Sequence, residues 1–209
     1  MNRLQKLDQN KSCGPDNLHP ALLKNSSDAF ALPLTLIFRK SLASSKLPLQ
    51  FRSANVTPLY KKGDKTIAAN YRPVSLTSVP CKILEGIIRH KIEKYFYDNN
   101  LLAEQQHGFV EKKSCTTNLL ETIDFITWSI ENGIPVDVVL LDFAKAFDTV
   151  AHKRAYGING LVLKYIEAFL KNRRQRIVKG EIVSDWVEIF SGVQCARFSY
   201  WSISICYLY

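Results

Sequence analysis

One apolar run near the middle of the chain most constrains the fold. Residues 136–141 are Val, Asp, Val, Val, Leu and Leu, and Asp142 follows them directly. A run this rich in β-branched apolar residues predicts a strand that is buried on both faces, as in the interior of a sheet. The sequence therefore predicts a mixed α/β (α+β) fold with a carboxylate at the end of an inner strand.

Apolar residues recur at helical spacing in other segments. The patterns predict helices over 21–24, from Pro33 onward, from Pro80 to Asn99, over 119–130 and over 162–170. The fourth of these helices is expected to turn one apolar face inward, made of Leu119, Ile123, Ile126 and Ile130.

Two pairs of extended segments predict hairpins. Segments 54–60 and 71–76 are joined by polar residues 61–65, three of them lysines, so this hairpin is expected to have a cationic tip. A second hairpin is predicted around Lys179 and Gly180.

The charge balance favours a polyanionic partner. The chain has 28 Lys and Arg against 19 Asp and Glu, a formal net charge of +9. Each cation that neutralises a phosphate releases counterions, which favours nucleic acid, although a solvated cationic surface gives the same balance. The chain has no membrane-spanning run and no apolar signal core, which indicates a protein that is not secreted and that resides in the cytoplasm or nucleus. Its five scattered cysteines favour free thiols.

The carboxylate of Asp142 is the strongest candidate for chemistry. A carboxylate held at the end of a buried strand suits Mg²⁺, which takes oxygen ligands and shares them with substrate phosphates. The competing interpretation is that Asp142 only caps the helix that follows, as strand-end aspartates often do.

Residues 138–150 resemble the first catalytic motif of reverse transcriptases from non-LTR retrotransposons of the jockey and CR1-like type. Five further blocks resemble the same family in order and spacing. They are residues 11–16 (Lys-Ser-Cys-Gly-Pro-Asp), 58–64 (Pro-Leu-Tyr-Lys-Lys-Gly-Asp), 70–78 (Asn-Tyr-Arg-Pro-Val-Ser-Leu-Thr-Ser), 106–109 (Gln-His-Gly-Phe) and 184–187 (Ser-Asp-Trp-Val).

This resemblance implies the fingers and an incomplete palm of a right-hand polymerase over residues 11–194, after an N-terminal tail of residues 1–10. It implies RNA-directed DNA polymerisation, with an RNA template, a DNA primer and deoxynucleoside triphosphates as partners and Mg²⁺ as cofactor. Residues 195–209 do not fit the family. When residues 196–209 are back-translated and read one nucleotide later, they give a motif of the family, so we expect a frame shift near Gln194 and an out-of-frame tail.

The resemblance also assigns roles to residues. Asp142 and the backbone carbonyl of Phe143 would hold Mg²⁺, and Phe147 would lie under the sugar of the nucleotide. Arg72 and Lys61 would grip the triphosphate. In the basic run 171–176, three arginines would contact template or primer: Arg173, Arg174 and Arg176.

Each of these roles has a plain structural alternative. Phe147 could be ordinary core, and Arg72 and Lys61 could be solvated hairpin charges. The basic run could be a solvated helix end that the helix dipole favours. We interpret His107 as a structural histidine.

The chain departs from the family in ways that bear on activity. Two-metal nucleotidyl transfer needs several converging carboxylates, and the sequence contains no two adjacent aspartates. Compared with the family pattern, residues 152–158 are also shortened, which we interpret as a deletion within a palm helix. We therefore expect a fragment of a reverse transcriptase that is inactive by itself. The competing interpretations are a non-enzymatic basic nucleic-acid-binding fragment and an inert pseudogene product.

Overall fold

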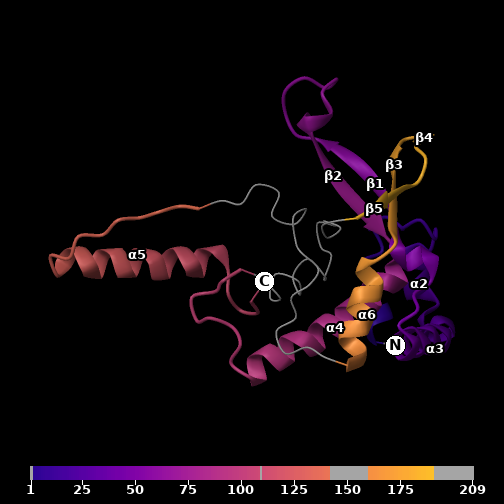
Figure 1. Cartoon of the computed structure of the whole chain (residues 1–209), viewed down its shortest axis with the longest axis horizontal. Coiled ribbons are helices and arrows are strands. Elements are labelled where there is room, and N and C mark those ends of the chain that lie inside the picture. Colours follow the sequence, from indigo (N-terminus) through magenta and orange to yellow (C-terminus); the bar gives the residue numbers. More distant parts are fainter. Residues whose placement is uncertain (1, 109, 142–159, 191–209) are drawn as a thin grey trace. The chain divides into compact units, whose positions relative to one another are not determined.

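The computed structural model describes residues 2–108, 110–141 and 160–190. These residues form two compact units, one of residues 2–92 and 160–190 and the other of residues 93–141. Figure 1 labels the strands and most of the helices. The described residues combine helices with a five-stranded sheet, which agrees with the predicted mixed α/β composition.

The α-helices of the first unit lie before the first strand of the sheet and between its second and third strands in sequence. Helix α2 (Pro20–Asn25) begins where predicted, with Pro20 in its first turn and the His19 side chain accepting a hydrogen bond from the amide of Ala21 at 3.2 Å. The elements are α1 (Asn2–Gln5), α2 (Pro20–Asn25), α3 (Ser27–Ser44), the single turn η1 (Leu49–Arg52), η2 (Ala68–Asn70), the first part of α4 (Val79–Asp98) and α6 (Gly160–Leu170).

Helix α3 corrects the prediction that Pro33 opens a helix. The helix begins at Ser27, and Pro33 lies inside it. A proline within a helix removes one backbone hydrogen bond, to the carbonyl four residues earlier. Pro33 is on the exposed side of α3, where water can take that place, whereas Leu34 and Phe38 are buried.

The sheet confirms both predicted hairpins. Its strands are β1 (Ser53–Tyr60), β2 (Tyr71–Thr77), β3 (Arg173–Lys179), β4 (Ile182–Val183) and β5 (Val187–Ile189), in the order β2-β1-β3-β4, with β5 also paired to β3. β1 and β2 are antiparallel, whereas β1 and β3 are parallel. β3 and β4 are antiparallel, and Gly180 between them has a φ of 62°, which glycine adopts without strain.

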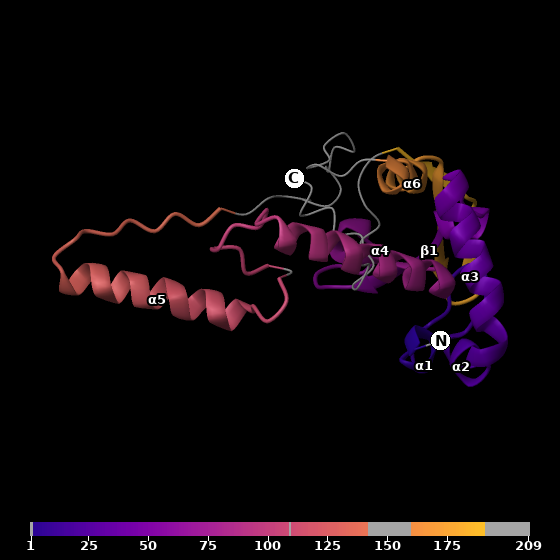
Figure 2. The same cartoon turned by 90° about the horizontal axis from the view of Figure 1, so that it is seen from below.

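The core of the first unit lies where the helices meet one face of the sheet. Helix α6 contacts α3, and the two helices lie side by side in Figure 2. Helix α6 buries Tyr165 and Phe169, and α4 buries Leu84. Residues 1–10 were predicted to be a tail, but Leu4 is buried and α1 contacts α2 and α3. Leu4 of the N-terminal segment therefore belongs to the core.

The second unit contains the end of α4, helix α5 (Cys115–Glu131) and the segment 134–141. The span of α5 agrees with the prediction, and Asn132 caps its end. Its predicted inward face is wrong for the described residues, because Leu119 is 59% exposed and Ile130 is 66% exposed. Apolar periodicity indicates which face favours burial, but it does not supply the surface that covers that face.

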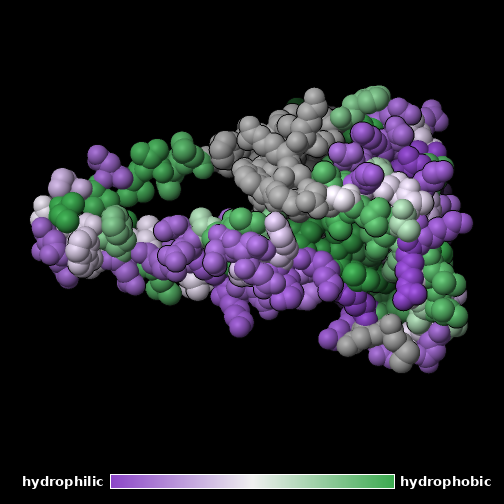
Figure 3. Space-filling model, turned by 60° about the horizontal axis from the view of Figure 1, so that its bottom comes forward, coloured by the Kyte–Doolittle hydropathy of each residue, from purple (hydrophilic) through white to green (hydrophobic). Residues whose placement is uncertain are grey.

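The predicted inner strand at 136–141 is also wrong for the described residues. This segment has no assigned secondary structure, and Val139 and Leu140 are 77% and 91% exposed. Figure 3 shows hydrophobic residues along it. A strand buried on both faces needs paired neighbours, and none of the described strands pairs with residues 136–141. The three cysteines that the structure describes, Cys13, Cys81 and Cys115, are free thiols, as expected. None of the described helices is long and apolar enough to cross a membrane.

Candidate functional site

The β1–β2 hairpin carries the two residues predicted to bind a triphosphate. Arg72 lies opposite Leu59 in the antiparallel register, and both side chains are exposed. Lys61 directly follows β1, and its amide donates a hydrogen bond to the carbonyl oxygen of Asn70 at 2.9 Å. Both cations are therefore attached to paired backbone, which fixes where each side chain starts.

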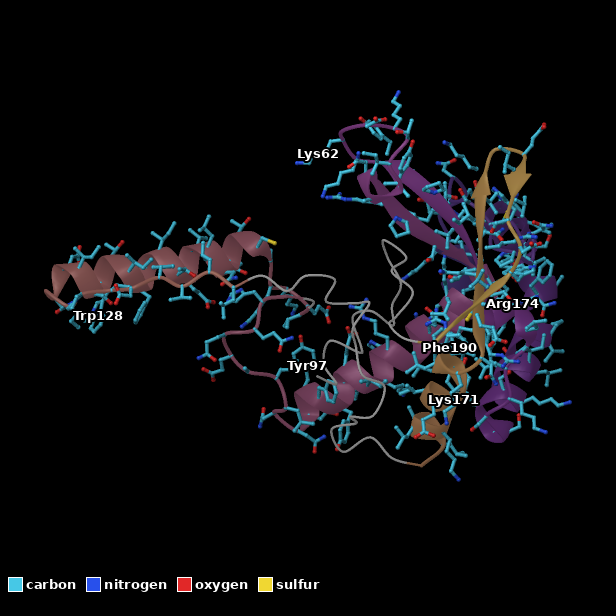
Figure 4. The ribbon with its side chains drawn as sticks, turned by 45° about the horizontal axis from the view of Figure 1, so that its top comes forward. Lys62, Tyr97, Trp128, Lys171, Arg174 and Phe190 are labelled. Carbon is cyan, nitrogen blue, oxygen red and sulfur yellow. The ribbon has the colours of Figure 1, made fainter. Side chains whose placement is uncertain are left out.

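The tip of this hairpin is ordered by its own polar groups. Asp64 accepts hydrogen bonds from the amide and the hydroxyl of Thr66, both at 2.8 Å. These bonds, the backbone one first, lower the pKa of Asp64 below its ordinary value. The Asn70 side chain donates to the Asp64 carbonyl at 2.8 Å, and the Tyr71 hydroxyl donates to the Lys65 carbonyl at 2.8 Å. The cationic tip, with Lys62 at its end in Figure 4, is therefore a structured turn.

A pair of tyrosines supports the opposite face of the hairpin. The rings of Tyr60 and Tyr71 meet edge to face, with centroids 5.7 Å apart. Lys65 Nζ lies 5.5 Å from the Tyr60 centroid, and Lys179 Nζ lies 5.4 Å from the Tyr71 centroid. These cation–π contacts connect the hairpin tip and β3 to one aromatic cluster.

The sheet register places three arginines on one face. Side chains alternate along a strand, and residues directly opposite each other share a face. Arg174 is paired with Ser53 and Arg176 with Asn55, so these four residues share the face that carries Leu59 and its partner Arg72. The face opposite the helical core therefore carries Arg72, Arg174 and Arg176.

Arg174 and Arg176 are held by side chains far away in the sequence. The Nε atom of Arg174 donates a hydrogen bond to Ser53 Oγ at 2.9 Å, and the Nε atom of Arg176 donates to Asn55 Oδ1 at 2.8 Å. The Trp186 ring centroid lies 4.3 Å from Arg174 Cζ and 4.6 Å from Arg176 Cζ. We call Arg174, Arg176 and Trp186 the arginine–tryptophan platform, and Figure 4 labels Arg174 on β3.

Sequence reasoning missed the partners that build this platform. Trp186 belongs to a family motif but had no assigned role, and Ser53 and Asn55 had no motif at all. Both hydrogen bonds join residues 121 positions apart. Only the parallel pairing of β1 with β3 brings these residues together, and a local pattern does not show that pairing.

Arg173 lies on the opposite face, away from the surface. Its side chain is 2% exposed, and its Cζ lies 5.0 Å from the Phe169 ring centroid. Because side chains alternate along β3, Arg173 points into the core while Arg174 points outward. The predicted nucleic-acid contact by Arg173 does not fit this burial, and its place in the fold indicates a structural role.

Arg173 belongs to a buried polar cluster with Cys81 and Glu85. Cys81 Sγ donates a hydrogen bond to Glu85 Oε1 at 3.2 Å. Burial raises the pKa of Glu85 to about 7, although the Cys81 hydrogen bond and the charge of Arg173 act in the opposite direction. Burial likewise lowers the pKa of Arg173 to about 10, against the attraction of Glu85. Burial also raises the pKa of the Cys81 thiol.

His107 has the structural role that the sequence indicated. It is buried, with Nδ1 2.9 Å from Thr117 Oγ1 and Nε2 2.8 Å from Glu121 Oε2. Thr117 is also part of the capping box that starts α5 at Ser114. His107 therefore attaches the preceding loop to the first turns of this helix.

The predicted metal and sugar contacts lie outside the described residues. Asp142, Phe143 and Phe147 fall in the range 142–159. Within the residues that the structure does describe, no group of three or more His, Cys, Asp or Glu side chains is placed to hold a metal ion.

The sequence match to a known family completes the assignment. The reverse transcriptase (RNA-dependent DNA polymerase) family matches residues 60–185, more than half of the chain. The chain belongs to this family. The matched range contains the β1–β2 hairpin from its tip onward, the basic strand β3 and the sequence of the predicted catalytic motif.

Curated relatives place this reverse transcriptase chain among retrotransposon proteins. It is 27% identical to a probable RNA-directed DNA polymerase from transposon BS of Drosophila melanogaster, over 79% of this chain and 18% of the relative. It is 28% identical to the RNA-directed DNA polymerase from mobile element jockey of Drosophila melanogaster, over 72% of this chain and 17% of the relative. A third relative is the transposon TX1 149 kDa protein of Xenopus laevis, 27% identical over 74% of this chain and 12% of the relative.

These matches confirm the resemblance to non-LTR retrotransposon polymerases. The chain spans less than a fifth of the length of each of these relatives. This reverse transcriptase chain therefore corresponds to part of the reverse transcriptase domain of such proteins.

Proposed function

We propose that this chain forms the fingers and part of the palm of an RNA-directed DNA polymerase that adds deoxynucleotides to a primer 3′ hydroxyl on an RNA template. The observation that carries the proposal is the β1–β2 hairpin, which presents exposed Arg72 and Lys61 from paired backbone within the family match. Its template RNA would be met inside the cell, in the cytoplasm or the nucleus.

The chemistry of phosphoryl transfer explains why these side chains suit the task. The reaction depends mainly on positioning and on neutralising negative charge as it develops. The guanidinium of Arg72 can donate two parallel hydrogen bonds to one phosphate, and Lys61 adds a compact positive charge. Both residues start from fixed backbone, so less conformational entropy is lost when the triphosphate binds.

The metal-dependent part of the proposal rests on the family motif at residues 142–147. Asp142 and the backbone carbonyl of Phe143 would hold Mg²⁺, and Phe147 would lie under the sugar. When bound, Mg²⁺ would neutralise phosphate charge in the transition state. Because the sequence has no two adjacent aspartates, we infer that these 209 residues bind substrates without completing the two-metal site.

Nucleotide binding tests the role of the hairpin. A fluorescent deoxynucleoside triphosphate is titrated into the chain with Mg²⁺, using Arg72→Ala and the control Arg39→Ala, which removes an exposed arginine on α3. Loss of charge-assisted hydrogen bonds is expected to weaken binding roughly tenfold to a hundredfold for Arg72→Ala and little for Arg39→Ala. Equal affinities for both variants would contradict the proposal.

Primer extension on an RNA template tests the expected inactivity. We expect no incorporation by this chain alone. Incorporation that Asp142→Ala abolishes would instead show a complete catalytic site. Salt-sensitive RNA binding without nucleotide binding would favour a non-enzymatic nucleic-acid-binding fragment, which the arginine-bearing sheet face also suits.

A further inference from the structure

We propose that the arginine–tryptophan platform is a preformed clamp for two neighbouring phosphates of single-stranded RNA. This inference rests on the proposed function, since it names the strand that the polymerase copies. It goes further in assigning the clamp to Arg174, Arg176 and Trp186, and in making it independent of Mg²⁺ and of the incoming nucleotide.

The hydrogen bonds of the two arginines leave a defined part of each guanidinium for a ligand. Arg174 and Arg176 use Nε to donate to Ser53 Oγ and Asn55 Oδ1. Within the described part of the chain, the two guanidinium groups make these hydrogen bonds through Nε, and their terminal nitrogens remain as donors for a ligand. Both side chains are half-buried, so each fork is fixed at its base and reaches solvent.

The spacing of the two arginines fits a nucleic-acid strand. Residues two apart on a strand point to the same side and lie about 7 Å apart. Successive phosphates of an extended single strand are separated by a similar distance. Arg174 and Arg176 can therefore each meet one of two consecutive phosphates, an arrangement that follows one strand rather than the width of a duplex.

The Trp186 ring restrains the two arginine side chains, and because they cover it, a phosphate is a better ligand for the platform than a base. The ring centroid of Trp186 lies 4.3 Å and 4.6 Å from the two Cζ atoms. Cation–π contact restrains both side chains, which reduces the entropy lost on binding. Because the guanidinium groups occupy the ring, the platform suits phosphate contact better than base stacking.

The sheet face that carries the platform has a further cation, which favours RNA binding, and a carboxylate, which opposes it. Arg72 lies on the same face, two strands away from β3, and its partner Leu59 is four residues beyond the Arg176 partner Asn55 on β1. The two cations are therefore separated by roughly 10 Å across the sheet and by about 13 Å along it. A strand held by the platform is therefore on the face that carries the proposed triphosphate contact. Glu188 opposes this, because it is exposed and lies opposite Arg174 in the pairing of β5 with β3. Removing its charge should strengthen RNA binding.

Fluorescence anisotropy tests the clamp with a labelled single-stranded oligouridine, in EDTA and without nucleotide. Arg174→Gln with Arg176→Gln is compared with Arg39→Gln with Lys40→Gln, a control that removes two exposed charges from α3. We expect the platform variant to bind at least tenfold more weakly and the control to change less than twofold. The salt slope should fall by about 1.4, from two lost phosphate contacts.

Charge-preserving variants separate the clamp from general attraction and from misfolding. Arg174→Lys with Arg176→Lys should bind several-fold more weakly with the salt slope nearly unchanged, because lysine loses the fork and much of the ring contact. Trp186→Leu should behave in the same way, and Glu188→Gln should bind more tightly. Circular dichroism confirms that each variant keeps its fold.

Several outcomes would overturn the clamp. Equal weakening by the α3 control, unchanged affinity in the lysine variant, or tighter binding of single-stranded DNA or duplex through these residues would each do so. The result is distinguishable from failure of the proposed function. Platform-dependent RNA binding in a chain that binds no nucleotide would refute only the triphosphate site, whereas Arg72-dependent nucleotide binding with RNA binding indifferent to the platform would refute only the clamp.

Discussion

At the scale of single residues, alternation along β3 decides what each arginine does. Arg173 points into the core beside Glu85, and Arg174 points to the surface beside Ser53. The buried pair has a cost, since burial removes both charges from water and their attraction offsets only part of it. The consequence is a carboxylate whose pKa is raised to about 7.

The raised pKa of Glu85 predicts a pH-dependent stability. Its folded pKa of about 7 exceeds its ordinary value of 4.5, so the folded state keeps a proton that the unfolded state releases between these values. The free energy of unfolding should therefore fall as pH rises from about 4.5 to about 7, by up to about 3 kcal/mol. Urea unfolding at pH 5 and pH 8 measures this.

Two variants isolate the contribution of Glu85. Glu85→Gln should remove most of the pH dependence, because its side chain does not titrate. Glu167→Gln, at an exposed position on α6, should retain it. If Glu85→Gln kept the full dependence on pH, Glu85 would not be its source.

Gly14 gives a second prediction at this scale. An added Cβ would lie 2.5 Å from the Ser78 amide nitrogen and from the Thr77 carbonyl oxygen, which are backbone atoms that cannot easily move. Gly14→Ala should destabilise the chain by about 1–3 kcal/mol. Gly108→Ala, where nothing lies within 4 Å, is the matched control and should be nearly neutral. Chemical denaturation compares the two, and similar midpoints would count against close packing at Gly14.

The sequence could predict which residues of β3 were cationic but not which ones were accessible. The run 171–176 contains four cations among six residues, and its two interpretations were a nucleic-acid contact and a solvated helix end. Recognising β3 as a strand would have separated Arg173 from its neighbours through the period of two. Which face of β3 is buried and which is accessible still depends on the pairing of β3 with β1, which joins positions 121 residues apart.

At the scale of elements, local chemistry sets where most helices and strands lie. The β1–β2 hairpin, α4, α5 and α6 were all predicted from periodicity and turn residues, and the structure confirms them. Helix α3 and residues 136–141 were not predicted correctly. Pro33 is tolerated on an exposed helix face, and the apolar run has no paired strand among the described residues.

The start of α5 supplies the prediction at this scale. Ser114 Oγ accepts a hydrogen bond from the Thr117 amide at 3.1 Å, and Thr117 Oγ1 accepts one from the Ser114 amide at 2.8 Å. Ser114→Ala should lower the stability of the helix by about 1 kcal/mol, because the Thr117 amide in the first turn loses its acceptor. Amide hydrogen exchange of α5 measures this.

Thr122→Ala is the control for the cap. Thr122 lies inside α5, where its hydroxyl donates to the Asn118 carbonyl at 2.8 Å. Replacing it with alanine, the best helix former, should leave exchange unchanged or slow it slightly. Faster exchange in both variants would show a general effect of losing a hydroxyl rather than of losing the cap.

At the scale of the whole molecule, the two units differ in how they cover apolar side chains. The first unit buries Leu84, Tyr165 and Phe169 between helices and sheet. The second leaves Phe125 and Trp128 of α5 exposed, together with much of residues 134–141. The chain spans less than a fifth of the length of these curated relatives. The difference in burial of apolar side chains therefore affects the local stability of each unit when these 209 residues are alone.

Hydrogen exchange of the whole chain should resolve the two units. Protection depends on how many buried apolar contacts must break before an amide opens, so α5 should exchange faster than α6 and β1. Replacing Trp128 with glutamine should barely change the exchange of α5, because its ring is 56% exposed and contributes little burial. Phe169→Ala, which removes a buried ring, should speed exchange throughout the first unit. Strong protection of α5 that the Trp128 substitution abolishes would mean that its apolar face is covered in solution, and that residues 93–141 fold with more support than their described contacts provide.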